Sequence, residues 1–358
     1  MLSGPVHPGE LVCVTGANGF IASHLIGQLL EAGYAVRGTV RDPSDPSRVD
    51  HLKAMAEQVG ASDRLTLVQA DLMQPGSFDA AIAGCQAVVH AAASVVFNHP
   101  DPQKGIVDPS VEGTRNVLES VRKAGTVRRV IHTSSMVAAY GWNKPAEHVF
   151  DESDWNTAST LANDPYGVAK VQAERAARDH VDALPAAERF ELVHLNPGMV
   201  FGPPLVKRHA KASPRLVRDV ISRAQPGVPQ LMLSVVDVRD VAAAHLAALQ
   251  HAAPPPRCLI FAENAWMTDL MSDLQDMFPD VKMGARAIPK PLVLLAALTD
   301  KTLNVRQLWH LVGRAMPMDN SLSRSAYDMV YRPVAETLRE TAEPMMNEGW
   351  ARVKRRSP

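Results

Sequence analysis

Two side chains spaced one helical turn apart form the first candidate for chemistry. Tyr166 and Lys170 follow Pro165, which favours the start of a helix, so the pattern places both side chains on one helix face. An ammonium group beside a phenol favours the phenolate and lowers the phenol pKa from about 10, which would make Tyr166 a general acid or base. The same spacing also occurs on ordinary amphipathic helices, so the pair needs support from elsewhere in the chain.

A second candidate is a pair of hydroxyl groups at the end of a predicted strand. Ser134 and Ser135 follow the β-rich run 130–133, and the carboxyl edge of a parallel sheet is where open α/β folds bind ligands. A hydroxyl group at this edge could hold the carbonyl oxygen of a substrate. Serines at strand ends also satisfy loose backbone groups, and this alternative stays open at the level of the residues.

A glycine-rich turn lies between the β-rich run 11–15 and a helical stretch. It reads Thr15-Gly16-Ala17-Asn18-Gly19-Phe20-Ile21-Ala22. The pyrophosphate of a dinucleotide must approach backbone N–H groups and the positive end of a helix, so side chains at Gly16 and Gly19 would obstruct it. We interpret the segment as a dinucleotide-binding turn; the alternative is a tight turn that only joins a strand to a helix.

The residues at the end of the second predicted strand, 35–40, favour NADP over NAD. Sites that bind NAD usually carry an acidic residue there, but Val40 occupies that position and Arg41 follows. A guanidinium group suits the 2′-phosphate of NADP because it makes bidentate, charge-assisted contacts. The alternative is an exposed Arg41 with Asp42 as the ribose ligand.

Asp71 and Leu72 follow the third predicted strand, 65–69. A carboxylate at this place can accept a hydrogen bond from the adenine amino group. Its alternative role is to cap a helix that begins near Pro75.

These candidates need a scaffold that brings strand ends together. Short β-rich runs alternate with amphipathic stretches in the first half of the chain, which is typical of βαβ units and a parallel sheet covered on both faces. The predicted strands are 11–15, 35–40, 65–69, 87–90, 130–133 and 190–195, with a helix at about 165–181. We therefore predict an α/β protein with a Rossmann-type doubly wound parallel sheet and a smaller C-terminal substrate-binding lobe.

The chain changes character after Asn196, where prolines crowd the sequence. We predict an NADP-binding domain over 8–200. A helix at 238–251 and a strand at 258–262 are expected to return to this domain, and a further helix is expected at 269–277. The substrate-binding lobe would then comprise 201–237 and 263–350.

Composition excludes several classes of protein. The 358 residues include 37 Lys and Arg against 38 Asp and Glu, which leaves no basic excess for nucleic acid. Three separated cysteines and thirteen histidines show no disulfide framework or metal spacing, which favours a reducing compartment. The first ten residues lack the apolar stretch of a signal peptide, and the longest apolar run near the C-terminus, 292–298, is far below the roughly 20 residues that span a bilayer. We expect a cytoplasmic protein, monomeric or homodimeric, with no metal, nucleic-acid or membrane partner.

Together these motifs are similar to those of the extended short-chain dehydrogenase/reductase superfamily, which includes the NAD-dependent epimerases and dehydratases. The motifs that carry the resemblance are residues 15–22, Asp71-Leu72, His90-Ala91-Ala92-Ala93, 111–121, Thr133-Ser134-Ser135, Tyr166 to Lys170, Asn196-Pro197-Gly198 and Phe201-Gly202-Pro203. Residues 36–43 resemble the NADPH-dependent branch that contains dihydroflavonol 4-reductases, cinnamoyl-CoA reductases and microbial carbonyl (aldehyde and ketone) reductases.

The resemblance implies an NADPH-dependent oxidoreductase that transfers hydride to the carbonyl group of a small ketone or aldehyde. It implies that Tyr166 donates the proton, that Lys170 lowers the tyrosine pKa and binds the ribose, and that Ser135 holds the carbonyl, with Ser134 as the alternative. The implied cofactor-binding residues are Thr15, Gly16, Asn18, Gly19, Phe20, Ile21, Arg41, Asp71, Leu72, Ala91, Ala92, Ala93, Thr133, Ser134, Tyr166, Lys170, Pro197, Gly198 and Val200. The substrate pocket is expected to include Met136, Tyr140 and Pro204.

Departures from the family keep other activities open. Residues 163–170 lack the tyrosine-centred signature of the plant cinnamoyl-CoA reductases, which weakens a CoA-ester substrate. A hydroxysteroid-type dehydrogenase or a sugar-nucleotide epimerase would use the same fold and tyrosine. A non-catalytic dinucleotide-binding regulator would need the glycine turn but not the Ser135, Tyr166 and Lys170 set.

Overall fold

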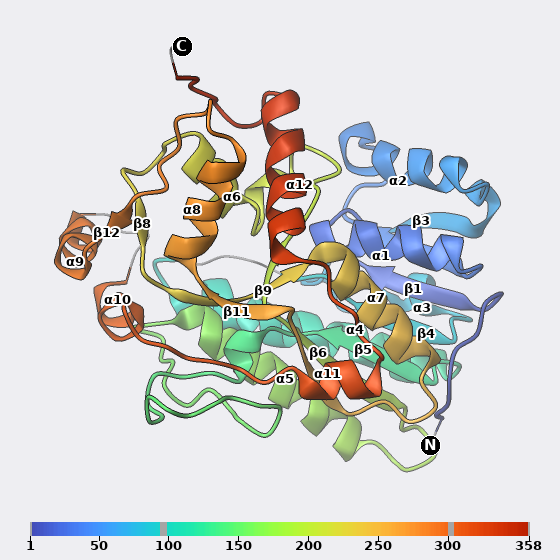
Figure 1. The fold of residues 1–358 in the computed structure, drawn as a ribbon. Helices are drawn as coiled ribbons and strands as arrows, with labels where there is room; N and C mark the ends of the chain where they lie inside the picture. The colour runs from blue at the N-terminus through green and yellow to red at the C-terminus, as the bar shows by residue number, and fades with distance from the viewer. Residues whose placement is uncertain (1, 94–98, 300–303, 357–358) are drawn as a thin grey trace.

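The computed structural model describes residues 2–93, 99–299 and 304–356, and its centre is a seven-stranded sheet (Figure 1). The strand order is β10-β6-β5-β4-β1-β2-β3, and all neighbouring strands are parallel. The strands are β1 (Leu11–Thr15), β2 (Ala35–Val40), β3 (Leu65–Gln69), β4 (Ala87–His90), β5 (Arg129–Thr133), β6 (Glu191–Pro197) and β10 (Arg257–Ile260). The order reverses direction at β1, so β1 and β4 flank the point where open α/β folds bind ligands.

Helices cover both faces of this sheet, as the predicted doubly wound fold requires. On one face α1 (Phe20–Glu31) packs against α7 (Val238–Gln250), and on the other α4 (Asp108–Ala124) packs against α5 (Pro165–Ala183) (Figure 1). Successive side chains of β1 point to opposite faces of the sheet, and both faces are covered. Val12 and Val14 join the core under α1, and Cys13 joins the core under α4. The remaining helices around the sheet are α2 (Pro46–Gln58), α3 (Asp79–Ile82) and the short turns η1 (Ser62–Arg64), η2 (Gln103–Val107) and η3 (Met136–Ala138).

A second, smaller unit has its own sheet and core. Its three strands are β7 (Met199–Phe201), β9 (Met232–Asp237) and β11 (Glu263–Trp266), in the order β11-β9-β7. Helices α6 (Arg215–Ile221), α8 (Met267–Met277) and α12 (Val334–Asn347) pack in one apolar cluster against it. The remaining elements of this unit are η4 (His209–Lys211), β8 (Val228–Pro229), β12 (Ala287–Ile288), α9 (Lys290–Thr299) and α10 (Val305–Leu311). Helix α11 (Ser321–Ala326) instead packs against β10 and the core of the large sheet.

The chain returns from the second unit to the large sheet through α7 and β10. Strand β10 pairs with β6 in parallel, so residues far apart in sequence form the sheet edge next to the catalytic candidates. Strand β6 runs on to Pro197, two residues beyond the predicted end, and β10 ends at Ile260 rather than 262. Helix α8 begins at Met267, two residues earlier than predicted.

The described helices include none that is long and apolar enough to cross a bilayer. Among the described residues, no group of three or more His, Cys, Asp or Glu side chains is placed to hold a metal ion. The three cysteines are buried free thiols in the structure.

Candidate active site

The glycine turn brings the backbone of β1 close to the backbone that follows β4. Gly16 adopts a left-handed conformation (φ +66°), and a Cβ atom there would lie 2.9 Å from the Cα of Ala92. Glycine is therefore required both by the backbone angle and by the close approach. Helix α1 begins directly after Gly19, and no side chain caps its first turn. The open N–H groups of this turn suit the pyrophosphate of a dinucleotide, so the residues present fit such a cofactor.

Thr15 fixes the segment after β4 against the glycine turn. Its Oγ1 accepts a hydrogen bond from the Ala92 N–H at 3.0 Å and lies 3.0 Å from Nδ1 of His90. Ala91 and Ala92 are partly buried, whereas Ala93 is exposed. Burial, with a smaller effect from the Lys170 charge, lowers the pKa of His90 to about 3, so this imidazole is neutral at physiological pH.

A small polar cavity of about 20 Å³ opens beside these residues. Its lining contains Leu72, His90, Ala92, Ala93, Pro109, Ser110, Gly113, Thr114, His132, Lys170 and Ala173. Four of the predicted cofactor residues therefore share one cavity: Leu72, Ala92, Ala93 and Lys170. Its volume suits about one water molecule.

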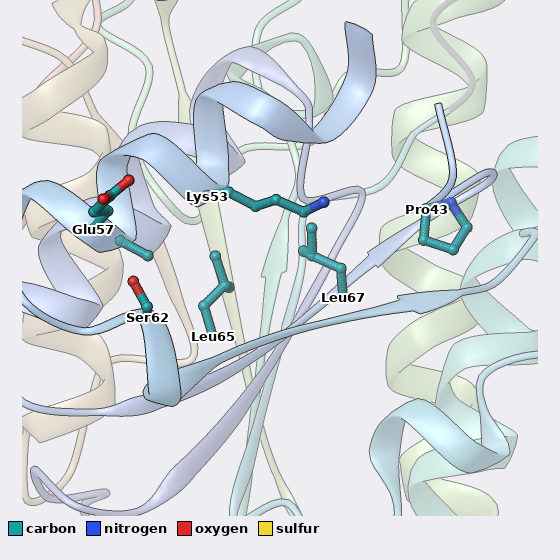
Figure 2. A pocket seen from close by; sticks show the side chains of 7 residues that line it. Pro43, Lys53, Glu57, Ser62, Leu65 and Leu67 are labelled. Atoms are coloured by element: carbon teal, nitrogen blue, oxygen red, sulfur yellow. The ribbon is translucent and has the colours of Figure 1, made fainter. Parts of the chain in front are cut away.

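A larger hollow than this cavity lies elsewhere. An open groove of about 470 Å³ runs between α2 and β3 and is lined by Pro43, Lys53, Ala56, Glu57, Ser62, Leu65 and Leu67. Figure 2 shows Lys53 and Glu57 of α2 facing Leu65 and Leu67 of β3. None of the predicted site residues lines this groove.

Arg41 lies directly after β2 with an exposed side chain. The neighbouring Asp42 is engaged locally, because its Oδ1 accepts hydrogen bonds from the Ser44 N–H at 2.9 Å and the Ser44 hydroxyl at 2.6 Å. These bonds lower the pKa of Asp42. The geometry therefore favours Arg41 over Asp42 as the side chain free to meet the adenosine end of a cofactor.

Asp71 does not cap a helix near Pro75. Its Oδ1 accepts a hydrogen bond from the Met73 N–H at 2.9 Å, and its carbonyl accepts one from the Ser77 hydroxyl at 2.6 Å. These bonds form a compact turn, and the next helix, α3, begins only at Asp79. The capping alternative is wrong. Asp71 remains exposed at the strand end, where its predicted contact with adenine stays a prediction.

Tyr166 and Lys170 lie in the first two turns of α5, on one face as predicted. Asp164 starts this helix by accepting a hydrogen bond from the Gly167 N–H at 3.1 Å, and Pro165 follows it. The Lys170 Nζ lies 5.9 Å from the centre of the Tyr166 ring. It also donates to the carbonyl oxygen of Thr133 at 3.5 Å, which ties α5 to the end of β5.

The Tyr166 pKa differs from the sequence prediction. Burial raises it to about 12, and a hydrogen bond from the side chain of Ser135 offsets this only in part. Burial also lowers the pKa of Lys170 to about 8. Spacing alone predicts that Lys170 makes Tyr166 more acidic, but desolvation of the phenolate is the larger effect here.

The two serines after β5 have different partners. The Ser134 hydroxyl donates to Oε2 of Glu174 at 2.7 Å inside the core, where Ser134 is 5% exposed. Ser135 has an extended backbone, caps the short helix η3 and reaches Tyr166 with its side chain. Of the two predicted carbonyl ligands, Ser135 therefore lies beside Tyr166, and Ser134 is engaged in the core.

Further predicted residues lie around the ends of β5 and β6. The Thr133 Oγ1 lies 2.9 Å from Nε2 of His245. Pro197 and Val200 are buried. Gly198 donates its N–H to the Ile260 carbonyl at 3.0 Å, and a Cβ atom there would lie 2.1 Å from the Ser234 carbonyl oxygen. Packing of the two sheets therefore already requires glycine at 198.

The predicted substrate-pocket residues fall in two places. Met136 follows Ser135 directly, and the charge of Tyr166 contributes to the raised pKa of Tyr140, although burial is the main cause. Pro204 is buried on the segment that crosses α1, next to Pro203, whose carbonyl lies 3.0 Å from His24 Nε2. Met136 and Tyr140 therefore lie near Ser135 and Tyr166, and the predicted place of Pro204 in the substrate pocket stays a prediction.

Sequence reasoning missed a buried polar network below the catalytic candidates. Glu174 is 0% exposed and accepts hydrogen bonds from Ser134, from Asn196 at 3.0 Å and from Arg257 at 2.6 Å. The same Asn196 amide also donates to the Ser135 carbonyl at 3.0 Å. The position of Glu174, one turn after Lys170, was the available signal. No local sequence pattern predicts the contact of Glu174 with Arg257, because Arg257 lies on the distant strand β10.

Comparison with known proteins places this geometry in a family. The family model described as "NAD dependent epimerase/dehydratase family" matches residues 12–260. The chain belongs to this family. The predicted extended short-chain dehydrogenase/reductase superfamily and the Rossmann-type fold are thereby confirmed.

Named relatives are reductases. The chain is 37% identical over 290 residues to "Cinnamoyl-CoA reductase CAD2" of Medicago truncatula, covering 80% of this chain and 86% of the relative. It is 32% identical over 294 residues to "Bifunctional dihydroflavonol 4-reductase/flavanone 4-reductase" of Malus domestica, covering 77% and 79%. A solved structure, yeast methylglyoxal/isovaleraldehyde reductase Gre2 complexed with NADPH, superposes with a TM-score of 0.77 at 27% identity, covering 95% of this chain and 99% of Gre2.

Proposed function

We propose that this protein uses NADPH to reduce the carbonyl group of a small ketone or aldehyde, with Tyr166 as the general acid. The observation that carries the proposal is the convergence of Tyr166, Ser135 and Lys170 at the carboxyl end of β5. These groups come from two separate elements, α5 and the turn after β5. A chance helical Tyr–Lys pair would have no such hydroxyl partner.

The class of enzyme and the cofactor follow from the comparisons. The curated relatives at 37% and 32% identity are named as reductases, and Gre2 was solved with NADPH. The predicted NADP(H)-dependent oxidoreductase is therefore confirmed at the level of class and cofactor. A small-molecule substrate is consistent with these names. The cytoplasmic location and the monomeric or homodimeric state stay predictions.

The proposed cofactor contacts follow from the geometry of the strand ends. The backbone at Gly16 and Gly19 would hold the pyrophosphate at the start of α1, and Arg41 would meet the 2′-phosphate. Lys170, which lines the small cavity, would bind the ribose. When bound, NADPH supplies the hydride that the carbonyl carbon accepts.

The side chains at the end of β5 would bind the substrate carbonyl and donate the proton. In the proposed reaction the Ser135 hydroxyl donates a hydrogen bond to the carbonyl oxygen and holds it beside Tyr166. The Tyr166 phenol then transfers its proton to this oxygen as the carbon gains hydride, which yields the alcohol and a phenolate. The Lys170 ammonium stabilises the negative charge that develops on Tyr166.

The raised pKa of Tyr166 favours the reductive direction. At about 12, the phenol is protonated at neutral pH and ready to act as an acid. Oxidation of an alcohol needs the phenolate, so its rate should increase as the pH rises, whereas reduction should not need alkaline conditions. Initial rates in both directions across a pH series measure this difference.

The central test is Tyr166→Phe, followed by the loss of NADPH absorbance with a panel of aldehydes, ketones and dihydroflavonols. We expect turnover to fall by about 10²–10⁴-fold, the usual contribution of a general acid. Binding of NADPH should change little. Tyr34→Phe is the matched control, because the Tyr34 hydroxyl donates to the Val6 carbonyl at 2.8 Å, away from the carboxyl ends of the strands.

Two results would contradict the proposal. Undiminished turnover in Tyr166→Phe would remove the tyrosine from the mechanism. Measurable NADPH binding by the wild type without turnover of any carbonyl compound would point to an epimerase-like or regulatory role instead.

A further inference from the structure

A segment of the smaller unit docks on the glycine turn through a buried histidine. His209 is 2% exposed, and its Nε2 donates to the Asn18 carbonyl at 3.3 Å. Its Nδ1 accepts from the Leu205 N–H at 3.3 Å, so one neutral tautomer satisfies both contacts. Its ring also lies 5.6 Å from the rings of Phe20 and His51. The segment that carries His209 is therefore held against both α1 and α2.

This docking brings Arg208, the residue before His209, to the positive side chains that follow β2. Arg208 is half-buried, and besides this desolvation it experiences the charges of Arg48, Asp45 and Arg41. It also acts on His51, the α2 residue that contacts His209. Arg208 therefore lies within range of the charges of Arg41, which follows β2, and of Arg48 in α2.

The local carboxylates leave two of these guanidinium groups without an acidic partner. Asp45 pairs with Arg48 at 2.7 Å, and Asp42 is engaged by Ser44. Within the ranges that the structure describes, neither Arg41 nor Arg208 forms an ion pair with an acidic side chain. Like charges held together and partly removed from water raise the free energy of the folded protein unless an anion joins them.

We infer that Arg208 completes, with Arg41 and Arg48, the binding site for the 2′-phosphate of NADP(H). A phosphate monoester offers several oxygens, and guanidinium groups bind such oxygens through paired N–H donors. The third arginine comes from the smaller unit rather than from the dinucleotide-binding sheet. The inference rests on the NADP(H) dependence proposed above and names a residue that the cofactor motifs do not include.

The inference has a structural consequence. A dinucleotide that carries the 2′-phosphate would contact the β2 end and the 205–211 segment at once, and so would tie the two units together. NADH lacks this phosphate and would make no such contact with the 205–211 segment. At equal ligand concentrations above both dissociation constants, NADPH should therefore raise the unfolding temperature more than NADH, because it binds more tightly.

The test compares binding of four probes by calorimetry: NADPH, NADH, 2′,5′-ADP and 5′-AMP. For Arg208→Gln we expect binding of NADPH and 2′,5′-ADP to weaken by about tenfold to a hundredfold, as for loss of a charge-assisted contact. Binding of NADH and 5′-AMP should change less than about twofold. Arg208→Lys keeps the positive charge but loses the paired N–H donors of the guanidinium group, so its NADPH affinity should lie between those of the wild type and Arg208→Gln.

The matched control is Lys207→Gln, which removes a neighbouring, exposed positive charge outside the cluster. It should leave all four affinities near the wild-type values. If Arg208→Gln and Lys207→Gln behave alike, Arg208 has no role in the site and the inference fails. Equal losses for NADPH and NADH would assign Arg208 to the pyrophosphate and overturn the 2′-phosphate assignment.

The result separates this inference from the proposed function. If the wild type fails to bind NADPH or 2′,5′-ADP, the proposed cofactor itself is wrong. If the wild type binds both and Arg208→Gln binds them equally well, only the inference about Arg208 is wrong. Circular dichroism of each variant checks that the fold is retained.

Discussion

The ends of β5 and β2 carry the two halves of the proposed chemistry, and they are built differently. At the end of β5 the polar groups are buried or half-buried and bonded to one another. Glu174 alone joins Ser134, Asn196 and Arg257. At the end of β2 the charged groups are exposed or half-buried, and Arg41 and Arg208 have no acidic partner among the described residues.

The difference reflects what each end must do. A proton donor must be held in one position before the substrate arrives, because misplacement costs rate, and a buried network supplies this rigidity. A phosphate site gains affinity from charges that the ligand neutralises, and two of the three arginines at this end, Arg41 and Arg208, have no carboxylate of the described chain to neutralise them. Substitutions at the β5 end should therefore affect stability and turnover, whereas those at the β2 end should affect cofactor choice.

The largest expected effect on stability comes from Glu174→Ala. Arg257 is 4% exposed and pairs with Glu174 at 2.6 Å, so the substitution leaves a buried guanidinium without its carboxylate. We expect the free energy of unfolding to fall by about 3–5 kcal/mol. Urea denaturation of the variant measures this loss.

Glu188→Ala is the control for this prediction, because Glu188 also pairs with an arginine, Arg122, at 3.1 Å but is 44% exposed. It should cost less than about 1 kcal/mol. Equal losses in the two variants would show that the β5 end does not depend on its buried network.

Substitutions of the two serines after β5 should distinguish a catalytic role from a role in stability. Ser135→Ala should lower turnover by about tenfold to a hundredfold, because it removes the hydrogen bond proposed to hold the carbonyl oxygen. Ser134→Ala should instead lower stability by about 1–3 kcal/mol, because the buried Glu174 loses a donor. Turnover numbers and urea midpoints for both variants test the pair. If Ser134→Ala lowered turnover more than Ser135→Ala while both variants were fully folded, Ser134 rather than Ser135 would be the carbonyl ligand.

Local patterns in the sequence were enough to predict the sheet. The strands of the large sheet formed within about two residues of the predicted bounds. The glycine turn and the Tyr166–Lys170 pair were also visible, because their function depends on spacing within one short segment. Such local geometry depends on residues that are close in sequence, so it can be predicted from one sequence without an alignment.

Contacts between distant segments were not predictable in the same way. Arg257 reaches Glu174 from 83 positions away through the pairing of β10 with β6, and no local pattern marks it. Arg208 lies in a proline-rich stretch that reads as a loop, and only the docking of His209 on Asn18 shows where it goes. The Tyr166 pKa was misjudged for a related reason, because spacing reveals a nearby cation but not the depth of burial.

The smallest effect we predict is on cofactor choice at the β2 end. Arg41 is exposed, so Arg41→Ala should leave stability within about 0.5 kcal/mol of the wild type. The ratio of kcat/KM with NADPH to that with NADH should fall by about tenfold, because an exposed, salt-screened contact contributes less than a buried one. The loss should diminish as ionic strength rises. If the ratio holds while turnover falls with both cofactors, Arg41 would belong with the residues that support catalysis, and the contrast between the two strand ends would not stand.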